Sequence, residues 1–211
     1  MNEITWSGAT IAWAMPSDVP DFDETDLRAM GLGQVERYRQ LAGARATGFL
    51  TGRALIRDLV RRLGGGPLVA LDSTCVRCGD HHAVPRTAGF VISVSHAGDL
   101  VVVGVAKGSA LLGVDVEAAA ADSRVAELGP MFAPRPAPDL AEWTRIEASI
   151  KADGRGVSID PGAVRLSPVP TQASLGVGPP LWEAVLPARS SPLRVATLAG
   201  PVGFVLSAAR G

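Results

Sequence analysis

The stretch Leu111-Leu112-Gly113-Val114-Asp115-Val116-Glu117 decides the fold, because its residue types alternate as they do in a β-strand. Successive side chains of a strand point to opposite faces, so we expect Val114 and Val116 on one face and Asp115 and Glu117 on the other. Two carboxylates on one exposed strand face repel each other unless a cation or a proton lies between them. The stretch therefore predicts a strand with an acidic face.

A helix is predicted further along the chain, at 139–154. Asp139 follows a proline and can serve as the N-cap, and Glu142 can complete a capping box with it. Gly154 can end the helix in the left-handed conformation that closes many C-termini. These signals predict both ends of the helix.

One face of this helix carries chemistry. In Trp143-Thr144-Arg145-Ile146-Glu147-Ala148-Ser149-Ile150-Lys151, residues four apart lie one above another, which aligns Trp143, Glu147 and Lys151. If the helix crosses the strand, Glu147 joins Asp115 and Glu117 around one hard cation. Mg²⁺ fits best, because it takes few carboxylates and completes its octahedron with water and phosphate oxygens. Lys151 would then face the phosphate as a point charge. The alternative is a solvated strand end beside an ordinary helix-surface ion pair.

The remaining pattern predicts a mixed α+β chain. We expect an opening strand at about 4–13 and a long helix at about 34–63 that ends at three consecutive glycines. The apolar stripe of this helix should face the core; it consists of Phe49, Ile56, Leu59, Val60 and Leu63. Further strands are predicted at 90–96, 100–106, 193–199 and 202–208, with loops and short edge strands in the Pro-, Gly- and Ser-rich segment 157–192.

Composition limits the class of protein. The chain has 211 residues, enough for one domain or two small lobes, and a net charge of −1, which provides no field to attract nucleic acid or an anionic membrane. No apolar stretch reaches the ~18 residues of a membrane span, and the N-terminus has Glu3 and no basic region, so we expect a cytoplasmic protein. The basic residues gather locally instead, at Arg37, Arg39, Arg45, Arg53, Arg57, Arg61 and Arg62.

A Cys-x-x-Cys pair, Cys75 and Cys78, precedes His81 and His82. Together these side chains offer three or four zinc ligands. A structural zinc site usually closes with two well-spaced pairs, however, and a reduced, metal-free loop is the state that the sequence favours in the cytoplasm. Redox chemistry is a third reading, without a thioredoxin-like context to support it.

Three motifs in order resemble the Sfp-type 4′-phosphopantetheinyl transferases: Ser95-His96, then Gly113-Val114-Asp115-Val116-Glu117, then Trp143-x-x-x-Glu147-x-x-x-Lys151. The resemblance covers most of the chain, including 49–55, the Cys75-x-x-Cys78-Gly79 loop and 91–96. Those enzymes use Mg²⁺ to move the phosphopantetheine arm of coenzyme A onto a serine of an acyl or peptidyl carrier protein, releasing 3′,5′-ADP. The resemblance implies the same activity here, in secondary metabolite biosynthesis.

The resemblance also implies an architecture. It predicts an α+β fold of two similar lobes with pseudo-two-fold symmetry and an active site in the cleft between them. The lobes would span 1–107 and 108–211, the second carrying the acidic strand and the Trp143 helix. A monomer that binds coenzyme A and a carrier protein, but no nucleic acid or membrane, is the expected form.

Residue roles follow from the matching motifs. The resemblance implies that Asp115, Glu117 and Glu147 hold Mg²⁺ and that Glu147 takes the proton of the carrier serine. Lys151 would stabilise or protonate the departing 3′,5′-ADP, and His96 would act beside it as a third catalytic residue. The residues expected to bind coenzyme A are Arg45, Arg53, Ser95, His96 and Lys151.

Some positions differ from the family pattern. Gly48 replaces an arginine, with Arg45 one turn earlier; Val84 replaces a basic residue before a proline; Ile146 replaces a lysine; and the segment 118–142 is short. An alternative is therefore a repurposed homologue with an eroded coenzyme A site that performs other acid–base chemistry on a polyketide or peptide intermediate. A carrier-binding module without turnover is a third possibility, against which the joint presence of the acidic residues and Lys151 argues.

Overall fold

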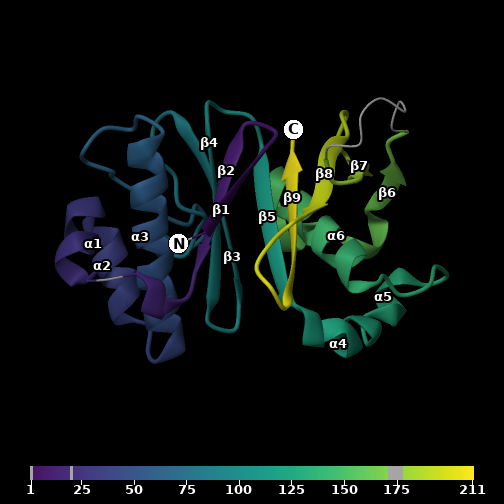
Figure 1. Cartoon of the computed structure of the whole chain (residues 1–211), viewed down its shortest axis with the longest axis horizontal. Coiled ribbons are helices and arrows are strands. Elements are labelled where there is room, and N and C mark those ends of the chain that lie inside the picture. Colours follow the sequence, from purple (N-terminus) through teal and green to yellow (C-terminus); the bar gives the residue numbers. More distant parts are fainter. Residues whose placement is uncertain (1, 20, 171–177) are drawn as a thin grey trace. The chain divides into compact units, whose positions relative to one another are not determined.

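Two separate antiparallel sheets organise the chain in its computed structural model, which describes residues 2–19, 21–170 and 178–211. The residues divide into two compact units, Met1–Ala110 and Leu111–Gly211. Each unit combines one sheet with helices, six in all within the described ranges (Figure 1). This confirms the expected mixed α+β class. The division falls after Ala110, a short way beyond the boundary expected at Lys107.

The first unit is built on a four-stranded sheet in the order β1-β2-β4-β3. Its strands are β1 (Asn2–Trp6), β2 (Ala9–Ala14), β3 (Phe90–Ala97) and β4 (Leu100–Lys107). The single opening strand predicted at 4–13 is wrong, because Ser7 and Gly8 have φ of 48° and 76° and turn the chain into a hairpin. Two consecutive residues with positive φ form the tight turn that matches the twist of paired strands.

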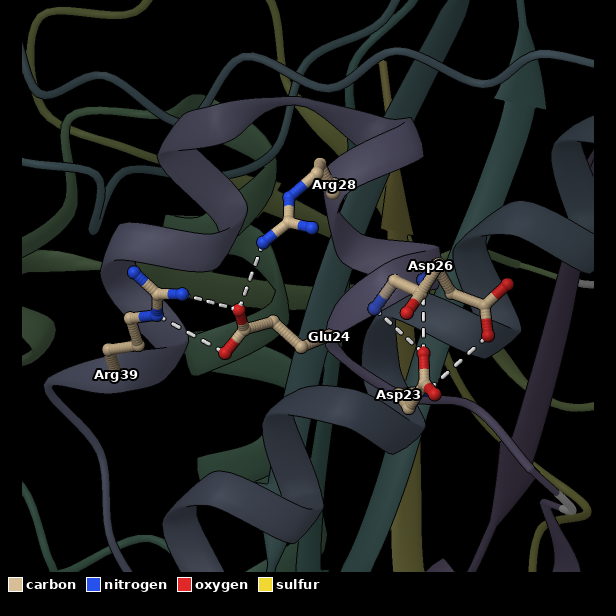
Figure 2. A network of polar contacts seen from close by, with 6 residues as sticks. Asp23, Glu24, Asp26, Arg28 and Arg39 are labelled. Carbon is tan, nitrogen blue, oxygen red and sulfur yellow. Dashed lines mark hydrogen bonds and ion pairs between the residues drawn. The ribbon is translucent and has the colours of Figure 1, made fainter.

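The helices of the first unit are α1 (Glu24–Met30), α2 (Leu32–Arg39) and α3 (Ala44–Arg62). The continuous helix predicted from residue 34 is wrong: the chain leaves the helical conformation between α2 and α3, and Gly43 has φ of +53°. Helix α1 was not predicted, although Asp23 caps it. The Asp23 carboxylate accepts hydrogen bonds from the backbone N–H groups of Thr25 and Asp26 at 2.7 and 3.2 Å (Figure 2).

Helix α3 covers the sheet of the first unit and supplies its core (Figure 1). Ile56, Leu59 and Val60 are at most 1% exposed and share one cluster with valines of β4. Phe49 and Leu63 are partly buried against the same cluster, so the predicted apolar stripe is confirmed. Burial of a side chain of this size stabilises the fold by roughly 1.5–3 kcal/mol.

Most arginines of the first unit hold its elements together. Arg39 of α2 forms two hydrogen bonds with Glu24 of α1, at 2.6 and 3.2 Å, and Arg28 reaches the same carboxylate (Figure 2). Arg39 lowers the pKa of Glu24. The other arginine pairings are Arg57 with Asp26, Arg62 with Glu3 and Asp58, Arg61 with the Pro67 carbonyl, and Arg37 with Gln40. The local basic cluster therefore consists largely of internal pairs.

The second unit has a five-stranded sheet in the order β5-β9-β8-β7-β6. Its strands are β5 (Leu112–Ala118), β6 (Arg165–Pro168), β7 (Leu181–Val185), β8 (Leu193–Leu198) and β9 (Phe204–Arg210). Its helices are α4 (Asp122–Ala126), α5 (Gly129–Phe132) and α6 (Leu140–Asp153). The last strand begins two residues later than predicted, because Gly203, with φ of +83°, belongs to the preceding turn. Residues 171–177 of the predicted loop segment lie outside the described residues.

Helix α6 lies directly on the face of β5 that carries the acidic residues (Figure 1). Gly113 makes this approach possible: a Cβ atom there would lie 1.9 Å from the Ala148 carbonyl oxygen and 2.4 Å from the Ala152 nitrogen. Asp139 caps α6 by accepting from the Glu142 N–H at 2.6 Å, and Gly154 ends it with φ of 84°. Both predicted ends of the helix are confirmed.

No helix in the described ranges combines the length and the apolar character that crossing a bilayer would require.

Candidate active site in the second unit

Strand β5 and helix α6 gather the acidic residues and the lysine in one place. Asp115 points from β5 toward α6 and is only 4% exposed. The Lys151 ammonium, in the last turn of α6, donates a hydrogen bond to Asp115 Oδ1 at 2.6 Å. Glu147 lies one helical turn before Lys151 and is half-buried, as is Glu117 at the end of β5. The neighbourhood thus contains three carboxylates and one ammonium.

The pKa values of two carboxylates reflect this crowding. Burial, and then the charge of Asp115, raise the pKa of Glu147, while Lys151 opposes the shift. Burial, and then the charge of Asp115, also raise the pKa of Glu117, with Arg124 and Lys151 acting in the opposite direction. Desolvation and like charges both disfavour an ionised carboxyl group. The acidic groups therefore interact with one another across the strand–helix contact.

A shallow pocket of about 200 Å³ opens beside Glu117. It is lined by Glu117, Ala121, Arg124, Val125, Leu128 and Trp143. Trp143 stands one turn before Glu147 on α6 and packs edge-on against Phe132 of α5, with 6.3 Å between ring centroids. The pocket therefore combines an apolar wall with a carboxylate and an arginine at its rim.

Sequence reasoning missed Arg124. This exposed residue of α4 lines the pocket and lowers the pKa of Glu117 by its charge. Its position follows from the short turn Ala119–Ala121 after β5, from which α4 starts, and α4 contacts α6. The sequence holds no periodic signal for that turn, so the proximity could be found only in the structure.

The residues present have the chemistry of a hard-cation site. Three carboxylates that repel one another suit a divalent ion with oxygen ligands such as Mg²⁺. In the described part of the chain, the one group of acidic, Cys or His side chains whose ligand atoms all lie within 4.8 Å of one another is Cys75, Cys78 and His82. The oxygens of Asp115, Glu117 and Glu147 therefore do not all lie within that distance of one another, and Lys151 is paired with Asp115.

The other predicted site residues belong to the first unit. Ser95 is buried on β3, and His96, the next residue, is exposed. Helix α3 passes close by: a Cβ atom at Gly48 would lie 3.7 Å from the His96 Nδ1 atom, which is an ordinary contact. Gly48, where the resembled family has arginine, is therefore the immediate neighbour of His96.

The two predicted arginines differ in their surroundings. Arg53 is 7% exposed; its Nε donates to Gln34 Oε1 at 2.6 Å, and its guanidinium lies 4.1 Å from the centre of the Phe49 ring. Burial lowers the pKa of Arg53 to about 9, so it stays a cation at neutral pH. Arg45 is exposed in the first turn of α3 and takes part in no ion pair with another described residue. Of the two, Arg45 is the accessible one.

Two further positions that differ from the family pattern, Val84 and Ile146, differ in their exposure to solvent. Val84 is 60% exposed in the loop before β3, where a basic side chain would reach solvent. Ile146 is 0% exposed and lies in the core of the second unit. The replacement at Ile146 is therefore a difference in packing and removes no charge from the acidic neighbourhood.

No protein-family model matches this chain, and no curated protein matches it either.

Proposed function

We propose that this protein transfers the 4′-phosphopantetheine arm of coenzyme A to a serine of an acyl or peptidyl carrier protein, in a magnesium-dependent reaction that releases 3′,5′-ADP. The observation that carries this function is the joint placement of Asp115, Glu117, Glu147 and Lys151 by one strand and one helix. Three carboxylates and an ammonium are the set that a divalent cation and a diphosphate require.

Mg²⁺ would be held by Asp115, Glu117 and Glu147 after a rotation of their side chains, and it would neutralise charge on the diphosphate. Glu147 would accept the proton of the carrier serine, whose oxygen forms a bond to the β-phosphorus of coenzyme A while the bond to 3′,5′-ADP breaks. A raised pKa makes Glu147 a better base at neutral pH than an ordinary carboxylate. Lys151 would stabilise the leaving phosphate as a fixed positive charge.

The first unit would contribute the grip on coenzyme A. His96 and Arg45 are exposed and offer charge-assisted hydrogen bonds to phosphate, whereas Arg53 supports α3 from within the core. The two similar lobes with one active site between them, which the family resemblance implies, belong to this proposal. Its support is that each unit places one long helix, α3 or α6, on an antiparallel sheet.

The test is transfer itself. The full chain is incubated with coenzyme A, Mg²⁺ and a panel of apo carrier proteins, and intact mass spectrometry looks for the added arm. Transfer to at least one carrier is expected, and it should stop when Mg²⁺ is removed with a chelator. Absence of transfer to every carrier, together with no detectable binding of coenzyme A, would refute the proposed activity.

Two matched variants distinguish an effect on the proposed active site from a general effect of removing a negative charge. Glu147→Gln should reduce the rate by on the order of 10²–10³, because it removes a group that acts on the reacting atoms. Glu183→Gln makes the same change of charge on exposed strand β7 and should leave the rate unchanged. Equal activity of both variants would exclude Glu147 as the base.

The second candidate is other acid–base chemistry in the same acidic neighbourhood, acting on a polyketide or peptide intermediate. It is favoured by the first unit, where Gly48 and Val84 bring no charge and most arginines are engaged in internal pairs. It predicts that coenzyme A does not bind, while Glu147 remains essential for turnover of such an intermediate. A binding assay with coenzyme A therefore distinguishes the two functions.

A further inference from the structure

The loop between α3 and β3 holds a second group of ligand-type side chains, in the first unit and apart from the acidic residues of the second. Cys75 Sγ, Cys78 Sγ and a ring nitrogen of His82 all lie within 4.8 Å of one another. The Cys78 sulphur and the His82 Nε2 are 3.1 Å apart, and both cysteines are free thiols. A tetrahedral zinc ion with ordinary bond lengths separates its ligand atoms by roughly 3.6–3.8 Å. The observed group has about this size.

The backbone of the loop is shaped around the two sulphurs. The N–H groups of Arg77 and Cys78 hydrogen-bond to the Cys75 sulphur. The N–H of Asp80 hydrogen-bonds to the Cys78 sulphur. Gly79 makes the turn possible with φ of +81°, and its N–H donates to the Cys75 carbonyl at 2.9 Å. Backbone N–H groups therefore converge on both sulphurs, and this fixes the positions of the two side chains within the turn.

The loop is closed at its base, which holds the three ligands together. Asp72 and Arg86 exchange two backbone hydrogen bonds at 2.9 and 2.8 Å, and their side chains form an ion pair at 2.6 Å. A further bond joins the Ala83 N–H to the Ser73 carbonyl at 2.9 Å. Cys75 therefore ends one arm of a hairpin-like loop, Cys78 lies in the turn at its tip, and His82 lies on the other arm.

The two adjacent histidines have different partners, which identifies the ligand. The His81 Nε2 lies 3.1 Å from the Glu36 carboxylate of α2, and its Nδ1 lies 3.4 Å from the Thr74 hydroxyl. His81 also packs on Gly33 of α2. His82 is exposed and faces the cysteines instead. The sequence alone could not choose between them.

We infer that Cys75, Cys78 and His82 bind one Zn²⁺ ion, with the fourth tetrahedral position taken by water or another small ligand. Two thiolates and an imidazole suit zinc and disfavour Mg²⁺ and Ca²⁺, which prefer oxygen. The ion would tie the two arms of the loop together, and His81 would anchor the loaded loop to α2. The reduced, metal-free loop that the sequence favoured is then the zinc-free state of the same structure.

Metal titration tests the site directly. The reduced, metal-free full chain is titrated with Co²⁺, and the charge-transfer absorption of a cobalt–thiolate bond is followed, then displaced with Zn²⁺. We expect saturation at one ion per chain. The absence of a thiolate band in protein with two titratable thiols would overturn the inference, as would a Cys75–Cys78 disulfide that persists under mild reduction.

Variants assign the ligands. Cys78→Ser and His82→Ala should each weaken zinc binding by more than about tenfold, because even changes outside the ligand shell cost 10–100-fold. His81→Ala should bind zinc nearly as well as the unaltered chain. Equal loss in His81→Ala and His82→Ala would refute the assignment of His82, and circular dichroism checks that each variant is folded.

Limited proteolysis supplies a readout that needs no variant. Arg77 is exposed between the two cysteines and is a trypsin site. Zinc should slow cleavage after Arg77 several-fold, and a chelator should restore it. Cleavage at an unchanged rate with one equivalent of zinc would show that the ion does not bind at this loop.

Discussion

Ionisation of Glu147 destabilises the folded state, because burial and the charge of Asp115 both disfavour its carboxylate form and raise its pKa. A carboxyl group whose pKa is raised by folding holds its proton more tightly in the folded chain than in the unfolded chain. Its contribution is therefore most favourable below the ordinary value of 4.5 and is lost as the pH rises through the folded pKa.

Glu147→Gln should therefore stabilise the fold while it slows transfer by on the order of 10²–10³. In buffer with a chelator at pH 7 its melting temperature should exceed that of the unaltered chain, and each 1 kcal/mol gained would appear as roughly 2–4 °C. The difference should shrink as the pH falls toward 4.5, where the carboxyl group becomes neutral in both states. Thermal unfolding across this pH range measures it, and a difference that does not depend on pH would contradict the electrostatic cause.

Gly48→Arg should strengthen coenzyme A binding if the proposed function holds. A Cβ at this position makes only ordinary contacts, with His96 and Val101, and the new guanidinium would stand beside His96. One added charge-assisted hydrogen bond corresponds to about tenfold or more in affinity. Calorimetric titration with coenzyme A measures the change.

The matched control is Gly48→Met, which gains the same helix propensity without the charge. Both variants should be more thermally stable than the unaltered chain, but only Gly48→Arg should bind coenzyme A more tightly. Equal affinities in the two variants would show that the lost charge at this position does not limit binding.

Single residues of the site were predictable where local geometry governs them. Strand alternation placed Asp115 and Glu117 on one face, and the four-residue helix spacing aligned Glu147 with Lys151. Burial was not predictable in the same way. Ile146, where the family pattern has a lysine, is a core residue, and Arg124, which the sequence did not single out, lines the pocket.

At the scale of elements, the contact of α6 with β5 is set by backbone atoms. Gly113 lies where any side chain would collide with the helix, at Ala148 and Ala152. The neighbouring core residues of α6 then pack over the sheet; they include Ile146, Ala148 and Ile150. The distance between the acidic groups of β5 and α6 therefore depends on the absence of a side chain at Gly113.

Gly113→Ala should push α6 away from β5. Overpacking of this kind typically costs about 1–3 kcal/mol, and the overlap here is with backbone, which cannot rotate away. Transfer should fall further than stability does, because a displacement of about 1 Å at a site can cost on the order of 10²-fold. Denaturant unfolding and the transfer assay measure the two effects.

Gly178→Ala serves as the comparison, since a Cβ there meets no atom of the described residues within 4 Å. It should leave both stability and transfer unchanged. A Gly113→Ala variant that behaved like Gly178→Ala would show that α6 moves without consequence for the site.

Elements whose ends are marked by capping residues or by a clear alternation were predicted correctly. Elements that end where one or two residues adopt a positive φ were not. Strand β5 and helix α6 agree with the sequence to within a residue or two at each end. The opening hairpin and the break before α3 depend on positive φ at Ser7, Gly8 and Gly43, which hydrophobic periodicity does not detect. The hydrophobic pattern therefore predicts which face of an element is buried better than it predicts where the element is interrupted.

At the scale of the molecule, two kinds of metal chemistry belong to two compact units. The first unit offers soft ligands, two thiolates and an imidazole, and the second offers hard carboxylates. Each unit has its own hydrophobic core. The two proposed sites should therefore load with different ions and respond to different chelators.

Binding at the two sites should be independent. Cys78→Ser should abolish zinc binding but leave the rise in melting temperature on addition of Mg²⁺ intact. Asp115→Asn should do the reverse, because the two proposed sites share no ligand residue. Differential scanning calorimetry with each ion on both variants tests this, and a loss of both responses in either variant would show that the sites are coupled.

Trp143 gives the proposed active site an optical label of its own. Its indole lines the pocket beside Glu117 and stands one turn from Glu147. Indole emission responds to nearby charge and to solvent, so an ion or a phosphate that settles among these carboxylates should change the fluorescence of this residue. The three remaining tryptophans, Trp6, Trp13 and Trp182, would supply a background that Trp143→Phe isolates. Ligand binding could thus be followed in real time without any dye.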